Sequence, residues 1–233
     1  MSTDNKLYLF QYKDGYRFNS DSLILYDFIS KFNIKGKVLD IGSGCGILGL
    51  LLKRNFPAID LTQVDVQTSH VFLNKKSAAK NHLETEILEL DITEANFEKK
   101  FDIVLSNPPF YNEGSQKSKN IALKISRYAN TLPFDELCKS VSSLIAPRGS
   151  FIFCYDAKQI DMLLATLLNF KFKVNDIRFV HTKKTKDASL VLIHAKKSSK
   201  SLCKIVSPLF MDSSEMNEIY NKTQTQSQLC QHC

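Results

Sequence analysis

The chain has 233 residues, 43% of them hydrophobic and 24% charged, and it carries a net charge of +7. This length supports one substantial core and is short for two full domains. Apolar runs stay below the roughly 20 residues that a membrane-spanning helix needs, and the N-terminus lacks the charged-then-apolar profile of a signal peptide. We therefore expect a cytoplasmic protein that does not bind a membrane.

The excess of Lys and Arg favours a polyanionic partner, because these side chains displace counterions from phosphates. The cysteines are scattered and several lie in apolar runs, so we expect reduced thiols. Cys230 and Cys233 have the spacing of half a zinc site. A second pair of ligands is missing near them in the sequence, so we expect no metal.

The first elements are expected outside the main sheet. Leu7–Tyr12 alternates weakly and is followed by Asp14-Gly15, a pair typical of tight turns, which predicts a short hairpin or an extended N-terminal arm over about residues 1–20. An amphipathic run that starts at Asp21 and ends near Gly36 predicts a helix.

From residue 37 onward, buried strands alternate with helices. Strands are predicted at Lys37–Ile41, Asp60–Asp65, Glu86–Leu90 and Phe101–Ser106, and helices at Ile47–Arg54 and Ser69–His82. This alternation requires a parallel sheet with right-handed crossovers.

The second half of the chain changes character. A helix at Phe134–Ile145, a turn at Pro147–Gly149, a strand at Ser150–Tyr155 and a helix at Ile160–Leu168 are followed by strands at Lys173–Val180 and Ala188–Ala195. No helical pattern separates the last two strands, so they predict an antiparallel hairpin at the sheet edge. We thus expect an α/β, Rossmann-like domain over residues 1–222 with a mostly parallel, seven-stranded sheet, and a flexible Gln- and Cys-rich tail over 223–233.

A glycine-rich turn follows the strand Lys37–Ile41, at the end of the sheet where doubly wound folds bind ligands. Its third glycine comes one position earlier than in the dinucleotide fingerprint, which presents a helix N-terminus to a pyrophosphate. The preceding carboxylate of Asp40 suits the ammonium and sulfonium charges of S-adenosylmethionine, which has no phosphate. We therefore predict S-adenosylmethionine as the cofactor, bound here by Asp40, Gly42, Ser43, Gly44 and Gly46.

Two further carboxylates follow the next strands. Asp65 is placed to accept hydrogen bonds from ribose hydroxyls, and Asp91 to meet an adenine amino group. Their neighbours Val66 and Ile92 are expected to line the same site. The alternative is that both aspartates only cap strand ends or form turns, as Asp does readily.

The segment Asn107-Pro-Pro-Phe-Tyr111 directly follows the strand Phe101–Ser106 and is stiffened by its two prolines. The side-chain oxygen of Asn107 and the carbonyl of Pro108 can accept the two N–H hydrogens of a planar nitrogen and so turn its lone pair toward a methyl donor. Phe110 would stack on the substrate and exclude water. The alternative, a simple turn, is weaker because a methyl-donor loop already precedes the segment.

These residues resemble the class I amino-methyltransferases marked by N-P-P-[FY]. Within them the chain is similar, over residues 11–220, to the bacterial tRNA(Val) adenine N6-methyltransferase family, whose N-terminal motif is matched by Gly15-Tyr-Arg-Phe-Asn-Ser-Asp-Ser-Leu-Ile-Leu25. The resemblance implies that Arg17, Phe18 and Asp21 close over the methionine end of the cofactor, which Asn107 also contacts.

The resemblance further implies a tRNA substrate, methylated at N6 of an adenine beside the anticodon, with the base splayed out of its stack. Pro109, Tyr111 and Arg127 are then expected to contact the substrate. Phosphate contacts are expected from Lys183, Lys184 and Lys186, and beyond them from Lys196, Lys197 and Lys200. An equally weighted alternative for these lysines is a solvated edge that discourages strand addition.

Other functions remain open. A protein glutamine N5-methyltransferase uses N-P-P-Y in the same way, although such enzymes have a separate N-terminal helical domain and a Tyr in place of Phe110. A DNA adenine methyltransferase, a nicotinamide enzyme and a binding module without catalysis are weaker alternatives. We expect a monomer.

Overall fold

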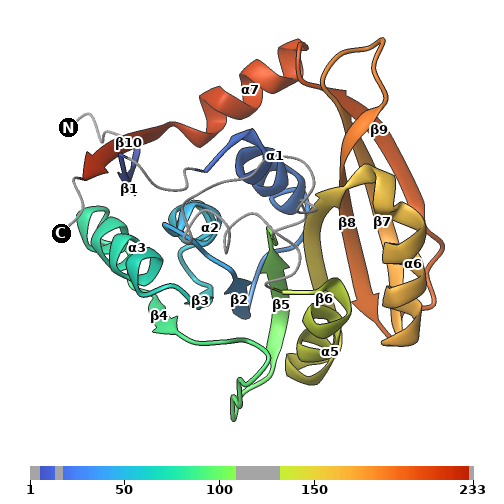
Figure 1. The fold of residues 1–233 in the computed structure, drawn as a ribbon, viewed down its shortest axis with the longest axis horizontal. Coiled ribbons are helices and arrows are strands. Elements are labelled where there is room, and N and C mark those ends of the chain that lie inside the picture. The colour runs from blue at the N-terminus through green and yellow to red at the C-terminus, as the bar shows by residue number, and fades with distance from the viewer. Residues whose placement is uncertain (1–5, 14–17, 109–131, 231–233) are drawn as a thin grey trace.

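An eight-stranded sheet forms the centre of the protein in the computed structural model, which describes residues 6–13, 18–108 and 132–230 (Figure 1). The strand order is β4-β3-β2-β5-β6-β8-β7-β9. The strands are β2 (Lys37–Ile41), β3 (Asp60–Asp65), β4 (Glu86–Glu89), β5 (Phe101–Ser106), β6 (Ile145–Asp156), β7 (Phe172–His181), β8 (Ala188–Lys197) and β9 (Lys204–Phe210). Only β8 runs antiparallel to its two neighbours, so all other pairs within this sheet are parallel.

The helices form two groups, which Figure 1 shows on opposite faces of the sheet. One group packs α1 (Ser20–Ile29) against α2 (Ile47–Asn55) and α7 (Ser214–Thr223), with α3 (Thr68–Lys80) beside β3 and β4. The other consists of α5 (Phe134–Leu144) and α6 (Ile160–Asn169), with the short 3-10 helix η2 (Ala157–Gln159) leading into α6. Within the described ranges, no helix combines the length and apolar character needed to cross a bilayer.

The central strands form the core because helices cover both of their faces. Val104 and Leu105 on β5, and Phe151 and Phe153 on β6, are all 0% exposed, and the two phenylalanine rings stack with centroids 4.6 Å apart. Continuous apolar runs therefore predicted these strands correctly. The bounds expected for β2, β3 and β5 are confirmed without change.

The turn predicted at Pro147–Gly149 is wrong as a strand boundary. These residues lie inside β6, where the pairing with β5 shifts between Phe101↔Ile145 and Ile103↔Ser150. Arg148 adopts a φ of +63° within this irregular stretch. The turn-forming residues thus make a bulge in one long strand rather than a connection between elements.

The hairpin predicted for β7 and β8 is confirmed as antiparallel, but its place at the sheet edge is wrong. β9 adds to β7 and becomes the edge, which makes eight strands where seven were expected. Pro208 concealed this strand in the sequence, because proline lacks the amide that an interior strand requires. It is tolerated here since one side of β9 has no partner strand among the described residues, and the pairing shifts across this region.

A second, two-stranded sheet joins the ends of the chain. β1 (Leu7–Tyr12) lies outside the main sheet, as expected, but it pairs in parallel with β10 (Thr225–Cys230) instead of forming a hairpin. The other edge of β1 is held by α3 and the residue after it: Asn81 bonds both the amide and the carbonyl of Tyr8, at 2.9 and 2.7 Å, and Ser77 accepts the amide of Phe10 at 3.0 Å.

The expectation of a flexible tail is therefore wrong for residues 225–230. Their polar side chains cannot form a core, but the strand is stabilised through backbone hydrogen bonds to β1. Leu7 and Leu9 of β1 supply the burial, because both are 0% exposed. A strand of this kind depends on its partner and leaves little hydrophobic pattern in its own sequence.

An ion pair connects α7 to the outer strands. Arg178 on β7 is only 4% exposed and donates to both carboxylate oxygens of Glu215, at 2.7 and 2.8 Å. We expect Glu215→Gln to lower the free energy of unfolding by about 2 kcal/mol, because a buried guanidinium loses its charged partner while Glu215 itself is partly exposed and screened. Urea denaturation measures this, with Glu218→Gln on the exposed face of α7 as control; equal effects of the two substitutions would contradict the prediction.

Candidate functional site

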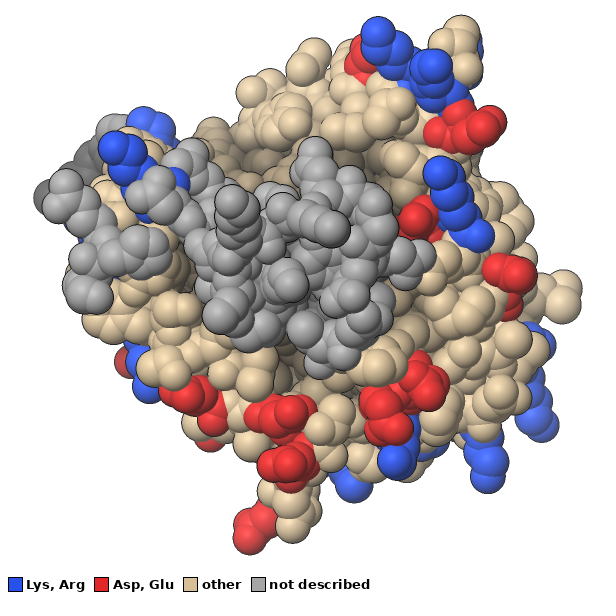
Figure 2. Space-filling model, in the orientation of Figure 1, with Lys and Arg blue, Asp and Glu red and all other residues tan. Residues whose placement is uncertain are grey.

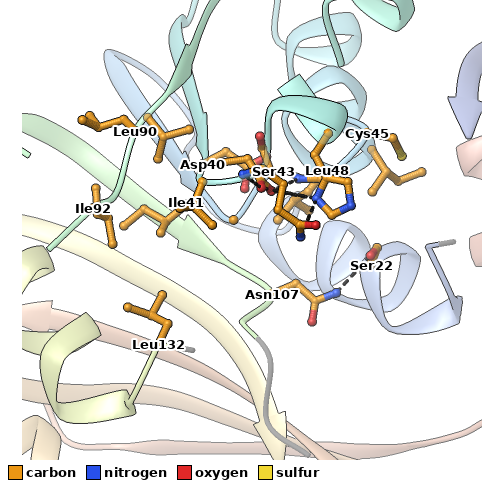
Figure 3. Close-up of a pocket in the computed structure, with 18 of the residues that line it drawn as sticks. Ser22, Asp40, Ile41, Ser43, Cys45, Leu48, Leu90, Ile92, Asn107 and Leu132 are labelled. Carbon is orange, nitrogen blue, oxygen red and sulfur yellow. Dashed lines mark hydrogen bonds and ion pairs between the residues drawn. The ribbon is translucent and has the colours of Figure 1, made fainter. Parts of the chain in front are cut away.

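A pocket of about 320 Å³ opens at the carboxyl ends of the parallel strands, beside the point where the strand order reverses between β2 and β5 (Figure 3). Its walls come from segments far apart in the sequence: Phe18 and Ser22 near the start of α1, residues 40–45 and 47–48 around the glycine loop, residues 64–67 with His70 after β3, residues 90–92 after β4, Asn107 after β5, and Leu132. This is the position in which doubly wound sheets bind their ligands.

The glycine loop leaves open space on its pocket side. Gly42 and Gly44 have φ values of +69° and +56°. Apart from each glycine's own chain neighbours, no atom of the described residues lies within 4 Å of the position that a Cβ would take at either residue. A ligand can therefore approach the backbone closely at both positions. Gly46 has a different function, because a Cβ there would lie 2.0 Å from Asn74 Oδ1, and it does not line the pocket.

Asp65 holds this loop in place. Its carboxylate accepts the amide of Gly44 at 2.8 Å and the amide of Gln67 at 2.9 Å, and it lies 3.3 Å from His70 Nδ1. The side chain is nevertheless part of the pocket wall. The turns after β2 and β3 are thus joined through one carboxylate that faces the ligand space.

Asp40 lies beneath the loop. It is 1% exposed, lines the pocket and accepts the amide of Gly49 in α2 at 3.0 Å. Burial, with a smaller effect of the charge on Asp65, raises the pKa of Asp40 to about 7. A cation bound in the pocket would favour the ionised form of this carboxyl group.

The residues that follow β4 bring both apolar and polar groups to the pocket. Leu90, Asp91 and Ile92 all line the pocket, and Ile92 is 5% exposed. Asp91 also closes a turn, because its Oδ1 accepts both the amide and the hydroxyl of Thr93, at 2.9 and 2.7 Å. Both interpretations of Asp91 from the sequence therefore apply, while Val66 is a half-exposed part of the pocket rim.

Asn107 lies at the end of β5 with its amide held from both sides. Its Nδ2 donates to Ser22 Oγ at 3.0 Å (Figure 3). Its Oδ1 accepts from Cys154 Sγ at 3.0 Å. Burial raises the pKa of Cys154 well above its usual value, so its sulfur keeps the proton that it donates. The oxygen of Asn107 has a second lone pair that can accept a hydrogen from a substrate.

Several predicted residues are placed differently or not described. Arg17, Pro109, Phe110, Tyr111 and Arg127 lie outside the described residues, whereas Pro108 is described and buried. Asp21 is in the first turn of α1, bonded to Asn19, and is not part of the pocket wall; burial raises its pKa.

The lysines that were expected to contact phosphates differ in their surroundings. Lys183, Lys184 and Lys186 are exposed in the turn between β7 and β8, which closes through a bond from the amide of Lys186 to the carbonyl of Lys183. Lys197, also expected to contact phosphates, is bonded within the protein, because its ammonium group donates to the hydroxyl of Ser142 at 2.7 Å and to the carbonyl of the same residue. It stabilises the C-terminal end of α5 instead.

The sequence analysis missed eleven residues of the site. Cys154 lies behind Asn107, and the other ten line the wall: Ser22, Ile41, Cys45, Ile47, Leu48, Val64, Gln67, His70, Leu90 and Leu132. Ser22 was part of the resemblance motif, directly after Asp21, and this was a usable signal. The interpretation of Cys154 as a small hydrophobe was compatible with its burial. Its contact with Asn107 depends on the pairing of β6 next to β5, which local sequence does not reveal.

A hydrogen-bonded group of polar side chains around His194 lies outside the pocket. His194 contacts Asp176 through Nδ1 at 2.8 Å and Ser150 through Nε2 at 3.0 Å, across β7, β8 and β6. The imidazole is 5% exposed, lies against the ring of Phe32 with centroids 4.3 Å apart, and has a pKa lowered by burial. We interpret it as a structural network between strands, because its ring faces packed side chains.

Comparisons with known proteins agree with this geometry. The family model described as the methyltransferase small domain matches residues 17–132, about half of the chain. The chain is 30% identical over 125 residues to ribosomal RNA small subunit methyltransferase C of Haemophilus ducreyi and 40% identical over 85 residues to that of Buchnera aphidicola. These matches cover 54% and 36% of this chain, and the chain spans only 38% and 24% of the length of those relatives.

Solved structures share the fold. A predicted O-methyltransferase from Agrobacterium tumefaciens superimposes with a TM-score of 0.68 at 16% identity, over 89% of this chain and 99% of that one. The 16S rRNA N2-guanine methyltransferase of Thermus thermophilus, solved with AdoMet and guanosine, gives a TM-score of 0.55 at 21% identity, over 79% of this chain and 45% of that one.

The strand order, the pocket and these matches define the class of the protein: it has the Rossmann-like class I methyltransferase fold, and its cofactor is S-adenosylmethionine. The fold and the cofactor predicted from the sequence are thereby confirmed. Within that class, the chain is similar to the ribosomal RNA small subunit methyltransferases C over their shared segment.

Proposed function

We propose that the protein transfers a methyl group from S-adenosylmethionine to an exocyclic amino nitrogen of a base in RNA. The observation that carries the proposal is the amide of Asn107, which faces the cofactor pocket from the end of β5 and is fixed by Ser22 and Cys154. The RNA methyltransferases among the similar proteins support the substrate class.

The lone pair of an exocyclic amine is delocalised into the base, so the amine is a poor nucleophile. Oδ1 of Asn107 and the carbonyl of Pro108 would accept its two hydrogens and turn the lone pair toward the cofactor. The bound cofactor supplies a methyl group on a positively charged sulfur. Most of the rate then comes from alignment and exclusion of water, and the proton released from the methylated nitrogen passes to solvent.

The residues that follow each parallel strand would bind a different part of the cofactor. The open backbone at Gly42 and Gly44, with Ser43, would receive the methionine part near the Asp40 carboxyl group. Asp65 would accept the ribose hydroxyls, and Asp91 an adenine amino group between Leu90 and Ile92.

Two bases remain as candidates, and different observations favour each. The N-P-P-F segment and the motif at residues 15–25 favour N6 of an adenine in tRNA. The names of the relatives and the guanosine in the Thermus structure favour N2 of a guanine in ribosomal RNA. Exposed lysines in the β7–β8 turn would contact phosphates of either RNA; Figure 2 shows basic side chains at the top right, where Figure 1 places this turn.

The deciding experiment is methyl transfer from labelled S-adenosylmethionine to total RNA and, in a parallel reaction, to total protein from a strain that lacks this gene. The tRNA and ribosomal RNA are then separated and digested for nucleoside mass spectrometry, and the protein is hydrolysed for amino-acid analysis. N6-methyladenosine in tRNA supports the first candidate, and N2-methylguanosine in ribosomal RNA the second. Label that appears only as methylglutamine in protein would overturn the RNA proposal. An Asn107→Ala enzyme serves as the negative control.

Binding of S-adenosylmethionine should depend on pH through Asp40. The free carboxyl group has a pKa of about 7, so below pH 7 a cationic ligand must displace its proton. If bound cofactor keeps Asp40 ionised, we expect the dissociation constant to rise about tenfold from pH 8 to pH 6. Calorimetric titrations at pH 6, 7 and 8 measure this. Asp40→Asn should bind more weakly at pH 8 and lose the pH dependence, and an unchanged slope in that variant would assign the proton to another group.

A further inference from the structure

A polar side chain occupies an inward position of β1. Leu7 and Leu9 are 0% exposed, and the next inward residue, Gln11, is 2% exposed. A buried amide is costly unless both of its ends are bonded. Gln11 meets this requirement, because its Nε2 donates to Ser227 Oγ at 2.7 Å and its Oε1 accepts the backbone amide of Phe18 at 3.1 Å.

These two bonds connect the C-terminal strand to the pocket wall. Ser227 belongs to β10, whereas Phe18 is one of the residues that line the pocket. The connection continues into α1, where Asn19 caps the helix by accepting the amide of Asp21 at 3.1 Å. One residue later, Ser22 accepts the hydrogen bond from Asn107.

We propose that Gln11 is a positioning residue through which β10 holds Phe18 against the cofactor pocket. The inference rests on the proposed function only in taking this pocket as the one that binds S-adenosylmethionine. The strand at residues 225–230 therefore contributes to cofactor affinity although none of its residues lines the pocket.

The side-chain contact and the backbone pairing of β1 are separable. The outer edge of β1 is bonded by Asn81 and Ser77. Replacing the amide of Gln11 with an apolar group of similar size would leave those bonds and the pairing with β10 in place. It would release the amide of Phe18 and remove the side-chain bond from Gln11 to Ser227 on β10.

The test measures S-adenosylmethionine affinity without RNA, by calorimetry, in Gln11→Leu and Ser227→Ala. We expect the dissociation constant to rise about tenfold in Gln11→Leu and about threefold in Ser227→Ala, the ratios that correspond to the loss of one or two neutral hydrogen bonds. The KM for S-adenosylmethionine should rise in parallel, while kcat at saturating cofactor should change less than twofold.

Two controls separate positioning from general stability. Gln226→Ala alters an exposed neighbour of Ser227 on the same strand. Leu167→Ala removes a side chain that is 0% exposed in α6, on the other face of the sheet, and lowers stability without touching β1. Both should keep the affinity of the unmodified protein at temperatures where they are folded.

The outcomes are distinct. A raised dissociation constant in Gln11→Leu with unchanged controls supports the inference. An unchanged constant in Gln11→Leu overturns it, as does an equal loss of affinity in Leu167→Ala, which would trace the effect to stability alone. If the unmodified protein did not bind S-adenosylmethionine, the proposed function itself would be contradicted, because the titration without RNA depends only on the cofactor pocket.

Discussion

Replacing Asn107 with Ala is expected to reduce kcat by about 10²- to 10³-fold, the scale seen when one preorganised polar contact to the reacting group is removed. The substitution deletes the oxygen that would accept a hydrogen of the substrate amine. It also leaves Ser22 and Cys154 without their shared partner. Single-turnover transfer to RNA measures the chemical step directly.

The affinity for S-adenosylmethionine should change much less, because Asn107 is one of many groups in the pocket wall. Ser22→Ala is the matched control. It keeps the Asn107 oxygen but removes one of the two contacts that orient the amide, so we expect a smaller loss of about tenfold in kcat. A rate in Asn107→Ala within a few fold of the unmodified enzyme would remove Asn107 from the reaction centre.

The parallel half of the sheet could be predicted because each strand is a short apolar run followed by a polar turn. β2 and β5 are buried between helices, so their sequences carry the signal of burial on both faces. β9 and β10 lacked that signal. β9 contains a proline at an edge, whereas the first four residues of β10 are polar and the strand is ordered by the backbone of β1.

The site residues likewise divide into those that the local sequence pattern reveals and those that it does not. Residues that directly follow parallel strands, such as Asp65 and Asn107, could be located from the sequence because the carboxyl ends of those strands meet at one edge. Cys154 and Gln11 could not, since each acts through a partner more than five residues away in the chain. Long-range hydrogen bonds leave no periodicity, and only the strand order brings these partners together.

Asp65 both holds the glycine loop in place and lines the cofactor pocket, and this makes its substitution the most informative test of cofactor binding. Its carboxylate bonds the amides of Gly44 and Gln67 and still lines the pocket. Any variant therefore changes the loop and the ligand contact together. Asp65→Asn retains the volume and one acceptor oxygen, whereas Asp65→Ala retains neither.

We expect Asp65→Ala to weaken S-adenosylmethionine binding about 100-fold, since hydrogen bonds to a charged group contribute roughly 1.5–3 kcal/mol each. Asp65→Asn should lie between Ala and the unmodified protein, because an amide can accept only one of the two backbone hydrogens through its oxygen. Equilibrium dialysis with labelled cofactor gives the dissociation constants. Asp60→Ala, at the exposed start of the same strand, controls for the loss of a negative charge. Equal affinities across the series would show that the ribose is bound elsewhere and that Asp65 only braces the loop.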